Sequence, residues 1–187
     1  MIKKSLRSFN PKRVAILETQ MWQAYYHHHF LKLFFLLVKL MREFFGSNFI
    51  SALHAAFFST LAAVDFRINK GKENNERITK YLVKFFQIIQ KQSIEGFDPH
   101  KAAEKELSWW LVDRYPERYE ISREESLAQA MSVVYSVDSS HLKEYAQHRA
   151  EAMGLQDEFE RGGDQVDWEK VELLLVRSFE SLRQAVL

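Results

Sequence analysis

The chain has 187 residues, and its 26 lysine and arginine residues nearly balance its 25 aspartate and glutamate residues, which leaves a formal net charge of +1. This balance argues against nucleic acid as a partner, and zero cysteines exclude disulfides, thiolate nucleophiles and cysteine-ligated metal centres. A chain of this length can build one sizeable core, so we predict a single domain over residues 1–187, with residues 1–9 flexible, in a cytoplasmic protein.

The first predicted element is a long helix. Asn10 followed by Pro11 is typical of a helix start, and a helical apolar pattern then continues to Phe45, where Gly46 ends it. The apolar side of this pattern rotates near the three histidines at 27–29. We therefore predict one long first helix that is kinked near the histidines or that packs against different neighbours at its two ends.

The run from Phe30 to Phe45 is the most apolar part of this element. It is too interrupted to span a bilayer, because Lys32, Lys39 and Glu43 form a polar stripe along it. A helix of this kind can lie on a membrane surface, but we favour a core helix with a solvated stripe and predict no membrane span.

Cap residues and apolar spacing predict the remaining helices, and no run of strict alternation predicts a strand. The predicted ranges are about 48–69, 75–95, 99–114, 123–137, 140–154 and 168–187, with a loop over 157–165. The sequence thus predicts an all-α bundle of six or seven helices.

Histidines are too poorly placed to predict a metal site. Consecutive helical residues point about 100° apart, so His27, His28 and His29 cannot converge on one ion from a regular helix. His141, Glu144 and His148 share one flank of a helix, but that flank lies opposite the apolar face and is interpreted as solvated. We predict no metal site, and the sequence identifies no cofactor.

Four charged residues lie on otherwise apolar helix faces: Glu18, Glu106, Arg114 and Arg149. A lone buried charge is unfavourable by several kcal/mol, so these groups should pair in the interior or bind a ligand. We predict that Glu18 and Glu106 approach Arg149 or Arg114. The candidate ligand-binding residues, which include neighbouring aromatics, are Glu18, Trp22, Tyr25, Tyr26, Glu106, Trp109, Trp110, Arg114 and Arg149. The alternative interpretation is a purely structural ion-pair network.

Several stretches carry a resemblance to other chains. These are FDPHKAAEKELSWWLVDR at 97–114, AYY at 24–26, HRAEAM at 148–153 and SFESL at 178–182. They resemble segments of uncharacterised bacterial all-helical proteins. The resemblance implies a bacterial, cytoplasmic origin and brings no activity or site residue with it.

Three functional hypotheses remain. The first is binding of a small apolar or amphipathic ligand, bearing a carboxylate or similar group, in an interior pocket. The second is a non-catalytic interaction module, such as a homodimer formed through exposed aromatic residues. The third is a metal-dependent enzyme that uses Glu18, Glu106 and a histidine.

Overall fold

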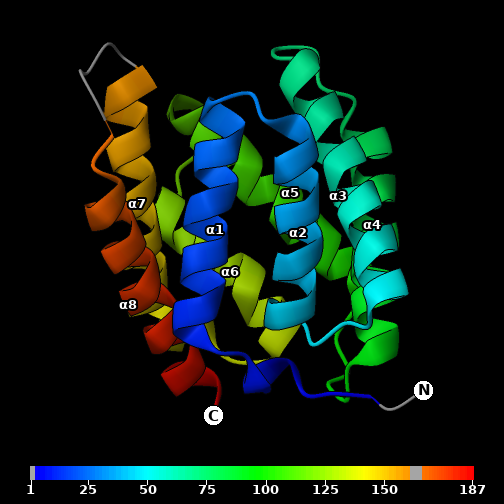
Figure 1. Ribbon diagram of the computed structural model, residues 1–187. Helices are drawn as coiled ribbons and strands as arrows, with labels where there is room; N and C mark the ends of the chain where they lie inside the picture. The colour runs from blue at the N-terminus through cyan, green and yellow to red at the C-terminus, as the bar shows by residue number, and fades with distance from the viewer. Residues whose placement is uncertain (1–2, 161–165) are drawn as a thin grey trace.

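The computed structural model describes residues 3–160 and 166–187 (Figure 1). Over these ranges the chain is all-helical, with eight α-helices and no β-strand. The helices are α1 (Pro11–Tyr26), α2 (Phe30–Phe44), α3 (Phe49–Ile68), α4 (Asn75–Gln92), α5 (Pro99–Arg114), α6 (Arg123–Tyr135), α7 (Lys143–Glu160) and α8 (Trp168–Val186).

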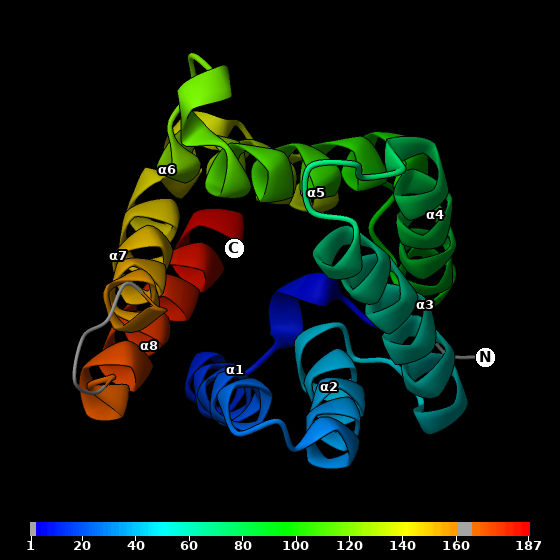
Figure 2. The same cartoon turned by 90° about the horizontal axis from the view of Figure 1, so that it is seen from above.

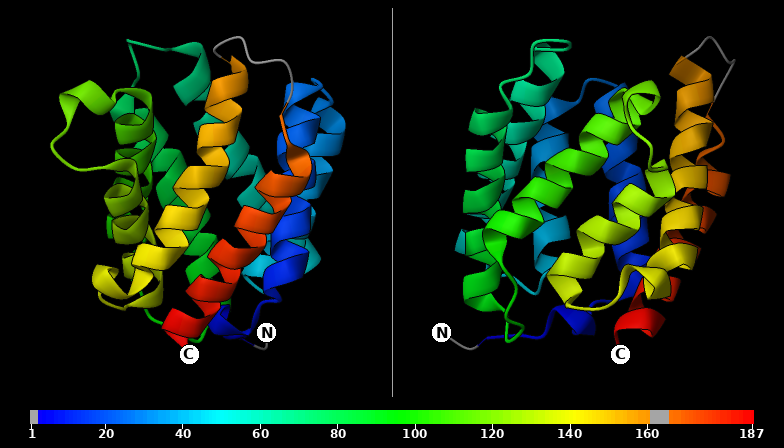
Figure 3. Two further views of the ribbon diagram at one scale, coloured as in Figure 1. Left: turned by 90° about the vertical axis from the view of Figure 1, so that its left-hand side faces the viewer. Right: turned by 180° about the vertical axis from the view of Figure 1, so that it is seen from behind.

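The helices form a ring in chain order. Seen from above, α1 to α4 follow one another around one part of the ring and α5 to α8 complete it, so that α8 returns to the side of α1 (Figure 2). α5 and α6 run obliquely across the back (Figure 3). Each helix therefore has one side turned toward the centre of the ring, and a polar residue on that side is brought close to residues far away in the sequence.

The prediction of one long kinked helix is wrong. The pattern over residues 11–45 forms two helices, α1 and α2, which pack side by side as an antiparallel hairpin and raise the helix count from six or seven to eight (Figure 1). His28 has a φ of 56°, and the N–H of His29 donates to the carbonyl of Ala24 at 2.8 Å, so the chain reverses at the histidines. Reversal turns both apolar sides toward the interior, which explains the rotation of the pattern.

The other boundaries largely follow the cap residues, and the main difference is at the end of α7. α5 covers 99–114, as predicted, and Asp98 caps it by accepting from the N–H of His100 at 2.8 Å. α7 continues through Gly154 to Glu160, because a glycine inside a helix destabilises it by only about 1 kcal/mol. The predicted loop over 157–165 is therefore helical up to residue 160, and 161–165 lie outside the described residues.

The amino-terminal segment lies against the bundle. The N–H of Lys4 donates to the carbonyl of Gln92 at 2.9 Å, and Leu6 is fully buried. The Phe9 ring packs edge-on against Phe44, with centroids 5.0 Å apart. For residues 3–9 these contacts differ from the flexible tail that the sequence predicts, because Leu6 and Phe9 supply apolar surface that the core accepts.

α3 differs from the other helices because it is apolar on nearly every side. Its inner face is built from small residues, and Ala52, Ala55, Ala56 and Ala62 are all fully buried. Among the described residues it is the one helix long and apolar enough to cross a membrane by length and composition, although core helices of other proteins pass the same test. A third of its most apolar 18-residue window, 33%, is buried.

Candidate functional site

A largely buried ion pair joins α1 to α7. Glu18 lies on the inner face of α1, where Val14 and Ala15 are also buried, and is only 4% exposed. Arg149 of α7 donates to both carboxylate oxygens, from Nη1 to Oε2 at 3.0 Å and from Nη2 to Oε1 at 2.5 Å. The predicted approach of Glu18 to Arg149 is confirmed, and its two-point geometry is the strong form of such a contact.

The Arg149 guanidinium stays charged in spite of its surroundings. Burial opposes the charge, but the attraction of the Glu18 carboxylate outweighs it and raises the pKa of Arg149 above its ordinary value. One turn earlier on α7, burial also raises the pKa of Tyr145 to about 12, against the opposing effect of Arg149. Both groups therefore keep their protons across the physiological pH range.

Glu106 of α5 is the third charged group at the centre. The indole N–H of Trp110 donates to its Oε1 at 3.0 Å. Burial of the carboxyl group raises the pKa of Glu106, and Glu18 adds to this effect by repulsion, while hydrogen bonds from Trp109 and Trp110 and the charge of Arg149 act against it. Arg149 thus acts on both carboxyl groups. It holds Glu18 by two hydrogen bonds, and it acts on Glu106 through its charge.

A cavity of about 150 Å³ lies beside these groups, and every one of the eight helices contributes to its wall. The polar part of the wall consists of Glu18, Ser59, Glu106, Tyr145 and Arg149, together with the indole of Trp110. The remainder is apolar and rich in phenylalanine: Met21, Leu40, Met41, Phe44, Phe45, Leu82, Phe85, Phe86, Met131, Val134 and Phe179. A chamber that is mostly apolar with a few polar groups gathered together is the usual form of a small-molecule site.

Arg114 does not reach this cavity. It lies at the end of α5, where its Nη1 donates to Glu73 at 2.9 Å and its guanidinium stacks on the ring of Phe66, 3.4 Å from the centroid. The hydroxyl of Tyr115 donates to the same Glu73 oxygen at 2.6 Å. Of the two arginines that the sequence leaves open as partners of Glu18 and Glu106, Arg114 is therefore not the one, because it pairs with Glu73 in the loop after α3.

Glu73→Gln should destabilise the protein by about 2 kcal/mol at pH 7. Burial alone would raise the pKa of Glu73, but hydrogen bonds from Tyr115, Gly71 and Arg114 overcome it and lower the pKa from 4.5 to about 2. The carboxylate therefore stabilises the fold fully above pH 4.5, and this contribution is lost as the pH falls toward 2. Urea unfolding at pH 7 and at about pH 3 should show the difference between the two proteins shrinking in acid, whereas a constant difference would contradict the assignment.

The predicted aromatic residues are divided between the cavity and the outside. Trp110 lines the cavity, and the ring centroid of Trp109 lies 6.2 Å from that of Trp110. The Trp22 ring centroid lies 6.0 Å from the guanidinium carbon of Arg149. Tyr25 instead lies under Arg67, 4.7 Å away, and Tyr26 packs on Trp168 at 5.8 Å. Neither tyrosine is part of the cavity wall, because both stand near the end of α1, beyond the level of Glu18.

The predicted site residues include neither Tyr145 nor Ser59 nor any of the phenylalanines that line the cavity. Tyr145 is four residues before Arg149 on the same face, so helical spacing alone could have found it. Ser59 is a small polar residue inside an apolar helix, and nothing in its neighbourhood distinguishes it. The phenylalanines of α2 and α4 carry the ordinary pattern of core residues, and only the closed ring shows which of them border the cavity.

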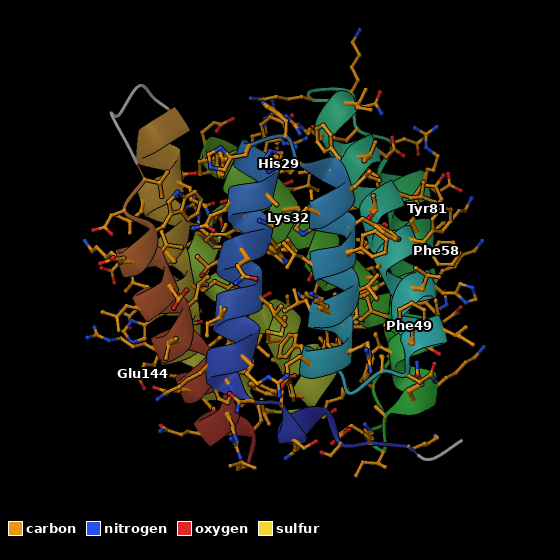
Figure 4. All side chains as sticks on the ribbon, viewed as in Figure 1. His29, Lys32, Phe49, Phe58, Tyr81 and Glu144 are labelled. Carbon is orange, nitrogen blue, oxygen red and sulfur yellow. The ribbon has the colours of Figure 1, made fainter. Side chains whose placement is uncertain are left out.

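The histidines lie away from the cavity, and none lines it. His29 is at the turn between α1 and α2 (Figure 4). His148 and Glu144 of α7 approach each other to 3.9 Å, and the Glu144 side chain is largely exposed. Within residues 3–160 and 166–187, no group of three or more histidine, aspartate or glutamate side chains is placed to hold a metal ion.

Comparison with known proteins adds no family to these observations. No protein-family model and no curated protein matches the sequence, and no solved structure matches the fold.

Proposed function

We propose that the protein binds a small, largely apolar molecule that carries one cationic nitrogen, with its apolar part in the central cavity and its nitrogen at Glu106. The observation that supports this most directly is a partly buried carboxyl group of raised pKa on the wall of a cavity lined by phenylalanines. Such a group lacks a full counter-charge, and a ligand can supply one.

The size of the cavity limits the ligand. An apolar cavity of about 150 Å³ accommodates a molecule the size of benzene. The cavity here has the same volume and an additional polar side. A ligand of about eight non-hydrogen atoms, such as a benzyl group with an attached amine, therefore matches the space.

The charge balance favours an amine over the carboxylate that sequence analysis suggests. The two terminal guanidinium nitrogens of Arg149 already donate to Glu18, so an anionic ligand would compete with Glu18 for Arg149. It would also face the carboxyl group of Glu106. A cation meets the opposite situation, because two carboxyl groups and one guanidinium carry a net charge of −1 when all are ionised.

The aromatic wall supports the same choice. Cations bind over the faces of aromatic rings, and tryptophan is the best of them. The Trp110 indole both borders the cavity and holds Glu106 through its N–H, so a nitrogen beside Glu106 also lies close to that ring. The Trp110 ring and the Glu106 carboxyl group would together favour benzylamine, which carries a cationic nitrogen, over toluene, which does not.

Calorimetric titration of the whole chain with benzylamine, toluene and phenylacetate tests the proposal. Benzylamine should bind more tightly than toluene, and phenylacetate should be the weakest of the three. Glu106→Gln should weaken benzylamine binding by roughly tenfold or more and leave toluene nearly unchanged, because the amide keeps the shape and removes the charge. Thermal unfolding of Glu106→Gln checks that the variant is folded.

The pH dependence gives a second measurement. Below its raised pKa the Glu106 carboxyl group holds a proton that the amine must displace, so benzylamine binding should strengthen as the pH rises from 4.5 through that pKa and then level off. Glu106→Gln should remove this dependence. If phenylacetate binds best, or if benzylamine binds Glu106→Gln as tightly as the unchanged protein, the proposal is wrong.

A further inference from the structure

The outward side of α3 is an apolar stripe. Ile50, Phe57, Val64 and Ile68 recur at intervals of seven, seven and four residues, which places them along one line of the helix. They are 67%, 51%, 46% and 74% exposed, so none of the described residues covers them fully. The line is about 27 Å long at 1.5 Å per residue and is interrupted by His54. Outward positions of a helix in a water-surrounded bundle are normally polar, so this surface points to a partner.

Basic side chains flank the stripe on both sides. On α2, which is packed against α3, Lys32, Lys39 and Arg42 are exposed and share the outward line with the exposed Leu31 and Phe35. On α4, the neighbour on the other side, the outward line carries three exposed lysines. These are Lys80, Lys84 and Lys91, and the Lys84 nitrogen lies 5.2 Å from the ring centroid of Phe58 on α3.

Of the flanking cations, only Lys80 is paired with an acidic residue of this region. Residues 30–92 contain four acidic side chains, and each is already paired with a basic one: Glu43 with Arg13, Asp65 with Arg77, Glu73 with Arg114 and Glu76 with Lys80. Residues 1–92 hold 15 basic and 5 acidic residues, whereas residues 93–187 hold 11 basic and 20 acidic residues. The net charge of +1 thus conceals a basic half that contains the apolar stripe and an acidic half that does not.

The ring keeps these two halves on different sides of the molecule. α2, α3 and α4 are consecutive on one side, and α6, α7 and α8 lie opposite them (Figure 2). Phe49 and Phe58 lie on the α3 and α4 side, whereas Glu144 of α7 lies on the far side (Figure 4). The molecule therefore has one face that is apolar in the middle and cationic at both edges.

We infer that the outward face of α2, α3 and α4 docks on a lipid bilayer with anionic headgroups, with the α3 stripe immersed in the interface and the flanking lysines at the phosphate level. An apolar line with cations beside it is the pattern of helices that lie in a membrane surface. A second copy fits less well, since a two-fold dimer through this face would place the lysine rows of both copies against each other. This docking goes beyond the proposed amine binding and does not depend on it.

Vesicle sedimentation with the full chain tests the inference. The protein should bind vesicles of phosphatidylcholine mixed with phosphatidylserine at least roughly tenfold more strongly than vesicles of phosphatidylcholine alone, and added salt should weaken the binding. The double variant Ile50→Ser with Phe57→Ser should reduce binding to the mixed vesicles by roughly tenfold or more. Both residues are exposed, so the fold should be retained, and circular dichroism checks this.

The acidic half provides a matched control. Leu173 of α8 is 50% exposed, close to the value for Phe57, but lies outside the stripe. Leu173→Ser should bind vesicles like the unchanged protein. The inference is overturned if the protein does not bind the mixed vesicles, if it binds both kinds equally, or if Leu173→Ser weakens binding as much as the double variant. A dimer in sedimentation velocity that the double variant dissociates, without vesicle binding, would instead assign the face to a second copy.

Discussion

Arg149→Met should destabilise the protein by about 3–5 kcal/mol at pH 7, the largest effect that we expect of a single charge removal. The substitution leaves Glu18, which is 4% exposed, without the two hydrogen bonds that Arg149 donates. It also removes the positive charge that opposes the raised pKa of Glu106. Urea unfolding followed by circular dichroism measures the loss.

Two further variants distinguish a buried charge from ordinary loss of packing. Glu18→Leu should destabilise less than Arg149→Met, because Arg149 is then left beside the remaining carboxyl group of Glu106, which attracts it. The double variant Glu18→Leu with Arg149→Met should recover most of the stability, since apolar residues of similar volume replace a buried pair at little net loss. Equal and small effects, below about 1 kcal/mol for each single variant, would show that the pair is solvated.

Phe179→Ala should destabilise the protein by about 3–5 kcal/mol, because it removes a buried aromatic side chain and enlarges a cavity that is already present. Phe179 of α8 is 2% exposed, and its ring centroid lies 5.3 Å from that of Phe44 and 6.3 Å from that of Phe9. It also borders the cavity beside Arg149. Thermal and urea unfolding measure the loss.

Added benzene provides a check on the position of Phe179. A ligand that binds only the folded state stabilises it, so benzene should raise the melting temperature of Phe179→Ala more than that of the unchanged protein. Leu173→Ala on the exposed side of the same helix should change stability by less than about 0.5 kcal/mol. A loss below about 1 kcal/mol for Phe179→Ala, or no response to benzene, would mean that this ring does not close the cavity.

Helical spacing in the sequence predicts which charged residues of the candidate site are buried, but not which of them pair. Glu18 and Arg149 are charged residues on apolar faces, and the high free energy of an unpaired buried charge was enough to predict that they meet. Spacing could not decide between Arg114 and Arg149, because the choice depends on the position of Glu73. That residue lies in a loop, where periodicity carries no information about which helix end is nearby.

The chain reversal at the histidines could not be predicted for the same reason, because local spacing does not decide between two long-range arrangements. A rotation of the apolar side by more than a right angle is compatible with a kinked helix and with a hairpin, and both have the same local pattern over residues 11–45. Packing decides between them, because only the hairpin brings both apolar sides to one interior. The left-handed backbone of His28 is the local result of that choice.

The helical class of the chain, the ends of most helices and the presence of buried charges that need partners can be read from the sequence alone. These features depend on caps, helical spacing and desolvation, which act locally. The closed ring of eight helices decided the rest: which arginine meets Glu18, which phenylalanines border the cavity, and that the basic half carries the exposed α3 stripe. These features depend on distances between residues far apart in the chain, and such distances are set only when all the helices pack together.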